Sequence, residues 1–275
     1  MPSSPASRSL VSSVALALLV AIAVASGASS ASPSADADAN TVKACVRARF
    51  PYDSSVQSIT LISGDRGGGT RVVKARVHWR RAEDGMSNVL VRLSSPPEMR
   101  GAGLLLLEHE KRNDVFMYLP ELKRVRRVTG HSLSTSVFGT DFSYEEFEWL
   151  QGMGRGGTMT RLADAVIATR PAHVVESRPA SDSSSAYERI VTYVDGEHCV
   201  PLQVEFYAAG DQLRKVLTAD PEQIRPEGTV PVPRRFEMRN LRQETSTEVR
   251  VETVELGVEQ TRALFTTRNL ESGRD

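Results

Sequence analysis

The chain has 275 residues, of which 40% are hydrophobic, 6% aromatic and 25% charged, and its 34 basic residues balance its 34 acidic ones. This balance gives the chain as a whole no bias toward nucleic acid or an anionic membrane surface. The length is sufficient for one large domain with a hydrophobic core.

The N-terminal segment has the pattern of a secretory signal peptide. Arg8 supplies a positive charge, residues 10–25 are apolar, and residues 26–37 are mostly small with several Ala-x-Ala-like cleavage sites. An uncleaved membrane anchor is the alternative, but the apolar run is shorter than the roughly 20 residues that a spanning helix needs. We expect residues 1–35 to be removed and residues 36–275 to form a single exported domain. Since no cysteine directly follows the apolar run, the mature protein is not expected to be a lipoprotein itself.

Both cysteines of the chain, Cys45 and Cys199, lie in the exported part. An even count in an oxidising compartment favours one disulfide between them, and two buried free thiols are the alternative. We predict that the disulfide ties an N-terminal helix, residues 41–50 with Asn40 as its cap, to the later part of the sheet.

Strands dominate the first half of the chain. Residues 58–63 and 70–81 are predicted strands around a glycine-rich turn, residues 65–69, which lacks the Lys-Ser/Thr pair of a phosphate-binding loop. Residues 70–81 alternate strictly, as a half-buried antiparallel strand does. One face carries Val73, Ala75, Val77 and Trp79, and the other carries Lys74, Arg76, His78 and Arg80.

The middle of the chain continues with strands at residues 88–93, 103–108, 115–118 and 123–129. The uninterrupted apolar run in residues 103–108 indicates contact on both faces, one with the core or a cavity and the other under a helix. A loop of small residues, 132–136, then leads to a short helix, residues 143–149. Ser143 and Glu146 have the spacing of a capping box for this helix.

The second half follows a flexible linker, residues 151–157, and is again rich in predicted strands, at residues 158–169, 173–177, 187–193, 199–208, 213–219, 232–240 and 247–256. A helical turn is expected at residues 258–264 and an extended end at residues 265–270. This pattern predicts a mainly β protein with a strongly curved antiparallel sheet of about nine to eleven strands and helices on its concave side.

No catalytic or metal-binding pattern stands out. The five histidines are scattered, and the sequence contains no HExxH, no G-x-S-x-G and no G-x-G-x-x-G after a strand. Asp141, Glu145 and Glu146 could form an acid/base pair or a cation site, but acids that complement the dipole of the short helix are the favoured interpretation. We therefore predict no enzyme, no cofactor and no metal.

A basic segment lies within residues 123–127 and consists of Lys123, Arg124, Arg126 and Arg127. A solvated strand face, or a sheet edge protected by charge, is one interpretation. The functional alternative is a contact for lipid headgroups or for an acidic surface on a membrane partner. Four cations without interleaved aromatic residues do not indicate a nucleic-acid site.

Two central motifs resemble a known family. YLPELKRVRRVTG at residues 118–130 and FGTDFSYEEFE at residues 138–148 are similar to the signature of the LolA-like, outer-membrane lipoprotein-sorting proteins of the bacterial periplasm. Further similarities occur in order along the chain, at residues 44–48, 96–106, 191–207 and 264–270. The resemblance implies an incomplete, half-open β-barrel with an apolar concave face and a few capping helices.

The resemblance also implies a function, namely a monomeric periplasmic carrier that binds lipid or the acyl chains of lipoproteins for transfer toward the outer membrane. Its partners would be an inner-membrane transporter and an outer-membrane acceptor. The residues expected to line the cavity or its cover are Val73, Val77, Trp79, Leu104, Leu106, Phe116, Tyr118, Phe138, Phe142 and Trp149. We expect the loop and helix of residues 132–149 to lie across the mouth, since Phe138, Phe142, Phe147 and Trp149 are more apolar surface than a free loop exposes. Ordinary core packing of these aromatics is the alternative.

Two other classes of function stay open at this stage. One is a non-enzymatic interaction module that accompanies a membrane lipid or efflux transporter, with its interior filled by side chains. The other is an enzyme on a related β scaffold, which would need a polar cluster deep in the pocket.

Overall fold

The computed structural model describes residues 33–34, 36–49, 54–110, 113–150, 152, 154 and 156–273. The predicted signal peptide lies almost entirely outside these residues. Residues 31–275 form one compact unit.

One continuous antiparallel sheet of thirteen strands forms the body of this unit, in the order β6-β5-β4-β3-β2-β1-β15-β14-β11-β10-β9-β8-β7. The strands are β1 (Ser54–Gly64), β2 (Thr70–Arg81), β3 (Ser87–Ser95), β4 (Gly103–Leu107), β5 (Asp114–Leu119), β6 (Arg124–Val128), β7 (Thr158–Ile167), β8 (Arg170–Arg178), β9 (Arg189–Asp195), β10 (Pro201–Ala208), β11 (Gln212–Ala219), β14 (Arg235–Asn240) and β15 (Thr245–Leu256). A separate hairpin consists of β12 (Ile224–Glu227) and β13 (Val230–Pro233). Each strand of the main sheet overlaps a strand predicted from the sequence, but the expected total of nine to eleven was too low.

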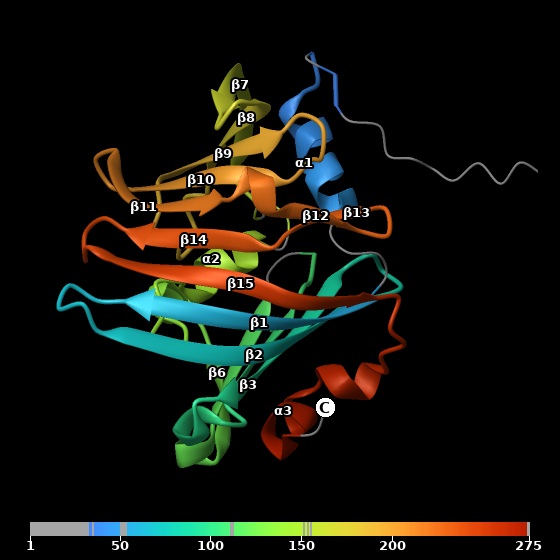
Figure 1. Cartoon of the computed structure of the whole chain (residues 1–275), viewed down its shortest axis with the longest axis vertical. Coiled ribbons are helices and arrows are strands. Elements are labelled where there is room, and N and C mark those ends of the chain that lie inside the picture. The colour runs from blue at the N-terminus through green and yellow to red at the C-terminus, as the bar shows by residue number, and fades with distance from the viewer. Residues whose placement is uncertain are drawn as a thin grey trace, which may run out of the picture. The chain divides into compact units, whose positions relative to one another are not determined.

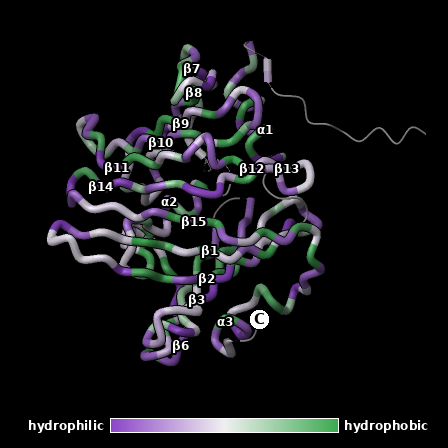
Figure 2. The backbone as a smooth tube through the Cα atoms, in the orientation of Figure 1, coloured by the Kyte–Doolittle hydropathy of each residue, from purple (hydrophilic) through white to green (hydrophobic). Residues whose placement is uncertain are grey.

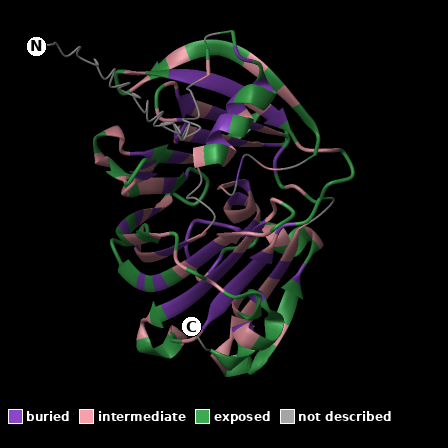
Figure 3. Cartoon of the chain, turned by 90° about the vertical axis from the view of Figure 1, so that its right-hand side faces the viewer, coloured by how far each residue is buried: buried purple, intermediate pink, exposed green. Residues whose placement is uncertain are grey.

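The sheet consists of two runs of neighbouring strands that meet at the pairing of β1 with β15. In Figure 1, β1 to β6 occupy the lower half of the molecule and β7 to β11 the upper half, with β14 and β15 between them. The sheet is curved but does not close into a barrel, since β6 and β7 each have only one strand neighbour in the part of the chain that the structure describes. The hairpin loops on the left in Figure 2 are drawn mainly in purple and white, and Figure 3 shows long buried stretches along the strands. The predicted fold class is confirmed.

The predicted alternation of β2 is also confirmed. Val73 and Trp79 are buried on the inner face, where Val77 is half-buried, whereas Lys74 and Arg76 are exposed on the outer face. His78 belongs to the outer face but is buried as well, because the C-terminal segment covers it and Gln260 Oε1 lies 3.1 Å from its Nδ1.

Strand β4 contacts packed layers on both of its faces, as the apolar run predicts. Leu104 and Leu106 belong to the inner core, whereas Leu105 packs on the outer face against Phe265 and Leu270. These two residues lie in η5 (Arg262–Phe265) and α3 (Thr267–Ser272). The chain is therefore helical at Arg262–Phe265 and Thr267–Ser272, and the extended end predicted for residues 265–270 is wrong.

Two interactions explain why the C-terminal segment forms a helix on the outer face. The Thr266 hydroxyl accepts a hydrogen bond of 3.2 Å from the backbone N–H of Asn269 and so caps the N-terminus of α3. The buried guanidinium of Arg92 donates to the carbonyl oxygens of Leu270 and Asn269, at 2.6 and 3.0 Å, near the other end. The sequence predicted helices on the concave side of the sheet. Helix α3 instead lies on the outer face, so this prediction is wrong for α3.

Helix α1 (Ala39–Arg49) packs Val42, Cys45 and Val46 into the inner core of the second half of the sheet. Asp38 caps this helix by accepting a 2.7 Å hydrogen bond from the backbone N–H of Thr41, so the predicted cap, Asn40, is two residues too late. The predicted disulfide is confirmed, since Cys45 and Cys199 are bonded with their Cα atoms 5.7 Å apart. It joins α1 to the turn between β9 and β10.

Candidate ligand-binding site

The inner face of the sheet borders two apolar cavities beneath α2 (Tyr144–Leu150). The first has a volume of about 100 Å³ and is lined by Ile59, Leu61, Val73, Ala75, Val91, Leu93, Leu104, Val137, Phe138, Thr140, Phe142, Phe147, Leu150, Phe236 and Val249. The second has a volume of about 220 Å³. Its lining includes Val77, Trp79 and Val89 from the first half of the sheet, Leu217, Ala219 and Val251 from the second, and Val230 and Val232 from the β12–β13 hairpin.

The apolar edge of α2 borders both cavities. Phe147 and Leu150, three residues apart on the same face of the helix, line both of them. Ile59, Phe236 and Val249 from the sheet also line both.

The structure brings together most of the residues predicted to line the cavity. Val73, Leu104, Phe138 and Phe142 line the first cavity, and Val77 and Trp79 line the second. Leu106 is buried beside Leu104 in the same core without bordering either space. Trp149 borders a third, polar cavity on the opposite side of α2.

Phe116 and Tyr118 do not belong to this site, so their predicted position is wrong. They lie opposite Leu105 and Gly103 in the pairing of β5 with β4. Directly opposed residues of an antiparallel pair share a face, and Leu105 faces α3, so both aromatics pack on the outer face. Val115 and Met117, the alternate residues of β5, face the inner core instead. The sequence prediction identified the strand correctly but assigned its two faces the wrong way round.

The segment that covers the inner face, here called the cover segment, comprises residues 136–150. It begins with a tight loop in which the backbone N–H of Val137 donates to the carbonyl of Phe142 at 2.8 Å. Phe138 and Gly139 adopt φ values of 53° and 72°, which lets the chain turn sharply over the first cavity. Phe142 is only 6% exposed and meets the ring of Phe236 edge-on at 6.3 Å between centroids. It therefore serves the core and lines the cavity at the same time.

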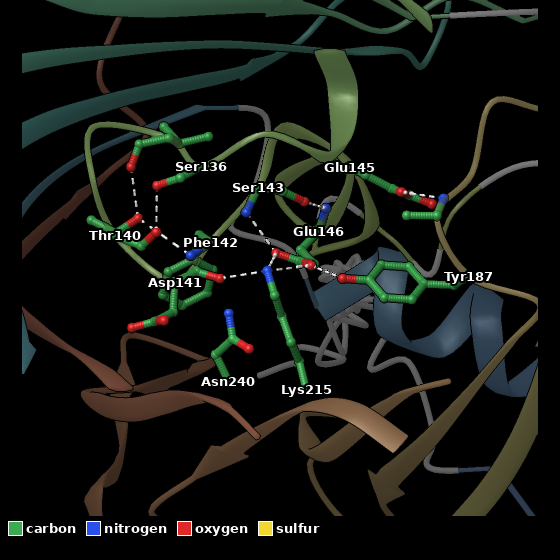
Figure 4. A network of polar contacts seen from close by, with 12 residues as sticks. Ser136, Thr140, Asp141, Phe142, Ser143, Glu145, Glu146, Tyr187, Lys215 and Asn240 are labelled. Carbon is green, nitrogen blue, oxygen red and sulfur yellow. Dashed lines mark hydrogen bonds and ion pairs between the residues drawn. The ribbon is translucent and has the colours of Figure 1, made fainter. Parts of the chain in front are cut away.

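The predicted capping box of α2 is present. The backbone N–H of Ser143 donates to Glu146 Oε2 at 2.6 Å, and the backbone N–H of Glu146 donates to Ser143 Oγ at 3.4 Å. The Glu146 carboxylate also accepts from Lys215 Nζ at 2.9 and 3.1 Å and from the hydroxyl of Tyr187 (Figure 4). Burial, with the neighbouring Glu146 charge, raises the pKa of Tyr187.

Asp141 anchors the cover segment at a second point. Its carboxylate accepts hydrogen bonds from the hydroxyls of Thr245 and Thr247 on β15, the latter at 2.8 Å. Its carbonyl oxygen accepts a 2.7 Å hydrogen bond from Lys215 Nζ (Figure 4). Asp141 and Glu146 thus hold the cover segment to the sheet, a role different from the complement to a helix dipole that the sequence suggested.

Four residues that hold the cover segment are not among those predicted from the sequence, namely Lys215, Tyr187, Thr245 and Thr247. The sequence does contain a pattern that indicates an inward-facing Lys215. Because side chains alternate along a strand, Lys215 lies on the same face of β11 as the buried residues Leu217 and Ala219. A lysine in the inward phase of a strand needs a buried acceptor, because an unpaired charge in a core is strongly unfavourable. The partner could not be read from the sequence, since it lies 69 residues away.

The third cavity lies on the other side of α2 and has a volume of about 520 Å³. Glu145, Glu148 and Trp149 face it from α2, Val128 to Gly130 from the end of β6, and residues 182–185 from the loop after β8. Arg47 and Glu108, which form a 2.9 Å ion pair, also line it. Burial raises the pKa of Glu145, although this carboxylate accepts hydrogen bonds from Ser185 and from the backbone N–H of Ala186.

The four cations of the basic segment are all exposed. Lys123 ends a 3₁₀ turn (Pro120–Leu122) in a left-handed conformation. Arg124 and Arg126 oppose Leu119 and Met117 on the inner face of β6, whereas Arg127 opposes Phe116 on the outer face and pairs with Asp114. The segment occupies an edge strand and does not form one uniform basic surface.

The described residues include no group of three or more His, Cys, Asp or Glu side chains placed to hold a metal ion. No helix among them is long and apolar enough to cross a membrane.

An open, curved sheet whose apolar inner face is covered by a short helix defines a half-barrel class of protein. Several solved structures share this fold. A putative outer-membrane lipoprotein-sorting protein domain from Vibrio parahaemolyticus matches with a TM-score of 0.76 and 22% identity, covering 84% of this chain and 97% of that one. A DUF1329 family protein from Desulfovibrio piger matches with a TM-score of 0.75 and 19% identity over 83% and 96% of the two chains. A LolA superfamily protein from Nitrosomonas europaea matches with a TM-score of 0.66 and 16% identity over 84% and 98%.

None of the curated proteins matches the sequence. A family model described as that of an uncharacterized protein matches residues 85–272, more than half of the chain. The chain therefore belongs to that family, and its fold is that of the LolA-like proteins that the central motifs resemble.

Proposed function

We propose that the protein is a periplasmic carrier that binds lipid or the acyl chains of lipoproteins between the sheet and α2, for transfer toward the outer membrane. The observation that carries this proposal is the pair of apolar cavities on either side of Phe147 and Leu150. The fold shared with a lipoprotein-sorting domain and a LolA superfamily protein supports it. An inner-membrane transporter and an outer-membrane acceptor are its expected partners.

The energetics of such binding need no specific chemistry. Each buried methylene contributes about 0.8 kcal/mol, so a 16-carbon chain gains on the order of 10 kcal/mol before ordering costs. The two cavities together reach the low end of the roughly 300–1,000 Å³ typical of ligand pockets. A long acyl chain needs more room than the two separate cavities give, so uptake in this proposal requires α2 to move.

The cover segment is the element proposed to move. Its backbone turns at Phe138 and Gly139, and it is held by a few polar contacts around Asp141 and Glu146. Residues on the inner face of β1 and β2 stay fixed in the sheet. In this proposal, uptake displaces α2, and release follows when a partner competes for the cover segment or for the acyl chain.

Lipids bound in the cell provide the direct test. The mature protein is purified from its native compartment, extracted with organic solvent and analysed by mass spectrometry. The variant Val77→Phe, which fills the second cavity, is compared with Val166→Phe, a matched change at a residue that is 68% exposed on β7. We expect acylated molecules with the wild type and Val166→Phe, and a marked loss with Val77→Phe. Absence of acylated molecules from all three would refute the proposal.

A non-enzymatic interaction module beside a membrane transporter is the second candidate. The observation that favours it is the division of the interior, since Phe147 and Leu150 occupy the space that an acyl chain would need. In that case the purified protein would bind neither extracted lipid nor a fluorescent fatty acid, and the cover segment would stay closed in hydrogen-exchange measurements.

A further inference from the structure

Three neighbouring hairpins at one end of the main sheet each carry an exposed apolar side chain. These rim hairpins are residues 64–74, 208–214 and 239–245, which contain the turns β1–β2, β10–β11 and β14–β15. Their six strands are consecutive in the sheet, and the three turns lie side by side on the left in Figure 1. The exposed apolar side chains are Val72, Leu213 and Leu241. Half of the large hydrophobic residues that are exposed in the described part of the chain therefore lie on the rim hairpins.

Leu213 and Leu241 share one surface depression. The backbone N–H of Leu241 donates to the carbonyl oxygen of Arg214 at 2.9 Å, which joins the second and third rim hairpins. Arg214 and Arg242, each the next residue after one of the leucines, line the same depression. Single exposed leucines are common on protein surfaces. Apolar side chains beside basic ones are typical of surfaces that bind at the boundary between lipid headgroups and acyl chains.

The charge of the rim hairpins is predominantly positive, since they contain six cations and three acids. Each acid already has a partner in the protein. Asp65 accepts a 2.8 Å hydrogen bond from the backbone N–H of Gly69 in its own turn. Asp211 pairs with Arg189. Glu244 pairs with Arg66 at 3.4 Å.

Three cations of the rim hairpins have no such partner. Lys74, Arg239 and Arg242 are exposed, and none of them forms an ion pair or a side-chain hydrogen bond with another residue that the structure describes. Free cations beside exposed apolar side chains fit a partner that offers both negative charge and apolar material.

The surface of an anionic phospholipid bilayer has both properties. Its phosphates attract lysine and arginine, and apolar side chains leave water when they enter the layer beneath the headgroups. An acidic protein surface would satisfy the cations, but it would need pockets spaced to match three apolar side chains. A fluid bilayer accepts these side chains at any spacing, which suits three separate turns.

The rim hairpins also lie beside the loop of the cover segment. A Cβ atom at Gly139 would lie 2.5 Å from Nη1 of Arg71 on the first rim hairpin. The Asp141 carboxylate accepts a hydrogen bond from the hydroxyl of Thr245 on the third. A membrane that contacts the rim hairpins would therefore lie close to residues 139–141.

We propose that the rim hairpins dock the protein reversibly on an anionic phospholipid bilayer. In this arrangement Val72, Leu213 and Leu241 enter the headgroup layer, while the free cations contact lipid phosphates. The surface is separate from the apolar cavities, so this docking does not depend on the carrier function. In a carrier it would present the loop of the cover segment to the membrane.

Vesicle flotation with the mature protein tests the docking directly. One set of vesicles contains equal parts of phosphatidylglycerol and phosphatidylcholine, and the other contains phosphatidylcholine alone. We expect binding to the anionic vesicles at about 50 mM salt, at least tenfold weaker binding at about 500 mM salt, and little binding to the neutral vesicles. No binding to the anionic vesicles, or equal binding to both sets, would overturn the inference.

Substitutions assign the binding to the rim hairpins. Leu213→Ser/Leu241→Ser removes the two leucines, and Arg239→Gln/Arg242→Gln removes two free cations. The arginine variant should bind anionic vesicles at least tenfold more weakly, because each basic residue near the surface contributes about fivefold. The leucine variant should also bind more weakly, and its remaining binding should be abolished by high salt.

Matched controls carry the same substitutions elsewhere on the surface. Leu162→Ser/Val166→Ser changes two exposed apolar residues of β7, and Arg225→Gln/Arg268→Gln changes two exposed arginines of β12 and α3. We expect both controls to bind anionic vesicles as the wild type does. An equal loss in the controls and the rim variants would show that no particular surface docks, and would overturn the inference.

A second measurement separates this inference from the carrier proposal. The rim variants should keep the melting temperature of the wild type and its affinity for a fluorescent palmitate analogue in solution, because the changed residues do not line the apolar cavities. Vesicle docking without binding of the palmitate analogue would support the rim surface and reject the carrier. Binding of the palmitate analogue without vesicle docking would do the reverse.

Discussion

Lys215 Nζ lies 2.9 Å from Glu146 Oε1, and the side chains of the two residues are 11% and 0% exposed. This ion pair joins β11 to the N-terminal turn of α2 and is the main charged contact of the cover segment in Figure 4. Its buried position makes the loss of one partner far more harmful than the loss of both.

Lys215→Met should lower the free energy of unfolding by about 3–5 kcal/mol, because Glu146 would retain a buried charge without its counterion. The double variant Lys215→Met/Glu146→Leu should recover much of that loss, since no charge remains to be buried. Urea denaturation of the wild type, the single variant and the double variant checks this. A double variant no more stable than the single one would show that the pair itself, and not the residual charge, determines the stability.

Loss of the Cys45–Cys199 bond should lower the melting temperature markedly. The bond closes a loop with a sequence separation of 154, for which the chain-entropy estimate is about 5 kcal/mol, while typical disulfides contribute 2–4 kcal/mol. Thermal melting with and without a reductant measures the effect. The variant Cys45→Ala/Cys199→Ala is the control, which should melt at the lower temperature in both conditions.

Phe138 and Phe142 should respond differently to replacement by serine. Phe138 is half-buried at the turn of the cover segment, so Phe138→Ser should change fatty-acid uptake while nearly preserving the melting temperature. Phe142 is 6% exposed and packs on Phe236, so Phe142→Ser should cost about 3 kcal/mol or more. Melting curves and a fluorescent fatty-acid titration distinguish them. A large fall in stability with Phe138→Ser, and unchanged binding by the folded fraction, would make this residue part of the core and end its proposed role in the cover.

Gly103→Ala should destabilise the contact between α3 and the outer face of the sheet. A Cβ atom at this position would lie 2.8 Å from Leu270 Cδ1 and 2.9 Å from the carbonyl oxygen of Val91. Such overpacking costs about 1–3 kcal/mol. The double variant Gly103→Ala/Leu270→Ala should show a loss smaller than the sum of the two single variants in urea denaturation, because one of the two clashes has been removed. Additive losses would mean that the Val91 carbonyl accounts for the whole effect.

Asp195 should contribute stability that disappears in acid. Burial raises the pKa of this carboxyl, but hydrogen bonds from the backbone N–H groups of His198 and Glu197 and from Arg170 outweigh burial and leave the pKa below its ordinary value. A lowered pKa stabilises the fold above the unfolded value of about 3.9, and this contribution is lost as the pH falls through the folded value. Asp195→Asn should therefore be less stable than the wild type at pH 7, and the two should converge below about pH 4. Urea denaturation across this range measures the difference, and a constant difference at every pH would contradict the assignment.

The strands, the capping box of α2 and the disulfide could be predicted because each depends on local chemistry. Alternation in β2, the Ser143–Glu146 spacing and an even number of cysteines are all visible within short windows or simple counts. The face that each strand presents was harder to predict. In β5, Val115 to Tyr118 are aromatic or apolar on both sides, so periodicity could not distinguish the inner face from the face beneath α3.

The polar anchors of the cover segment could not be predicted because they are long-range. Asp141 meets Thr247 at a separation of 106 residues, and Glu146 meets Lys215 at 69. A carboxylate in the first turn of a helix looks the same in sequence whether it faces solvent or a buried lysine.

The pairing of β1 with β15 has a consequence for how the molecule is made. Ser58 of β1 pairs with Thr253 of β15. Strand β1 is therefore synthesised early, whereas the strand that pairs with one of its two edges is among the last parts of the chain to be synthesised. Until then β1 presents a bare edge of unpaired N–H and C=O groups, a template for pairing with other chains. The two runs of strands can each form from near neighbours, but closure of this long-range seam is a slow step with a high entropic cost. Premature termination upstream of Thr245 would leave two separate sheets, each with a bare edge, and aggregation would follow.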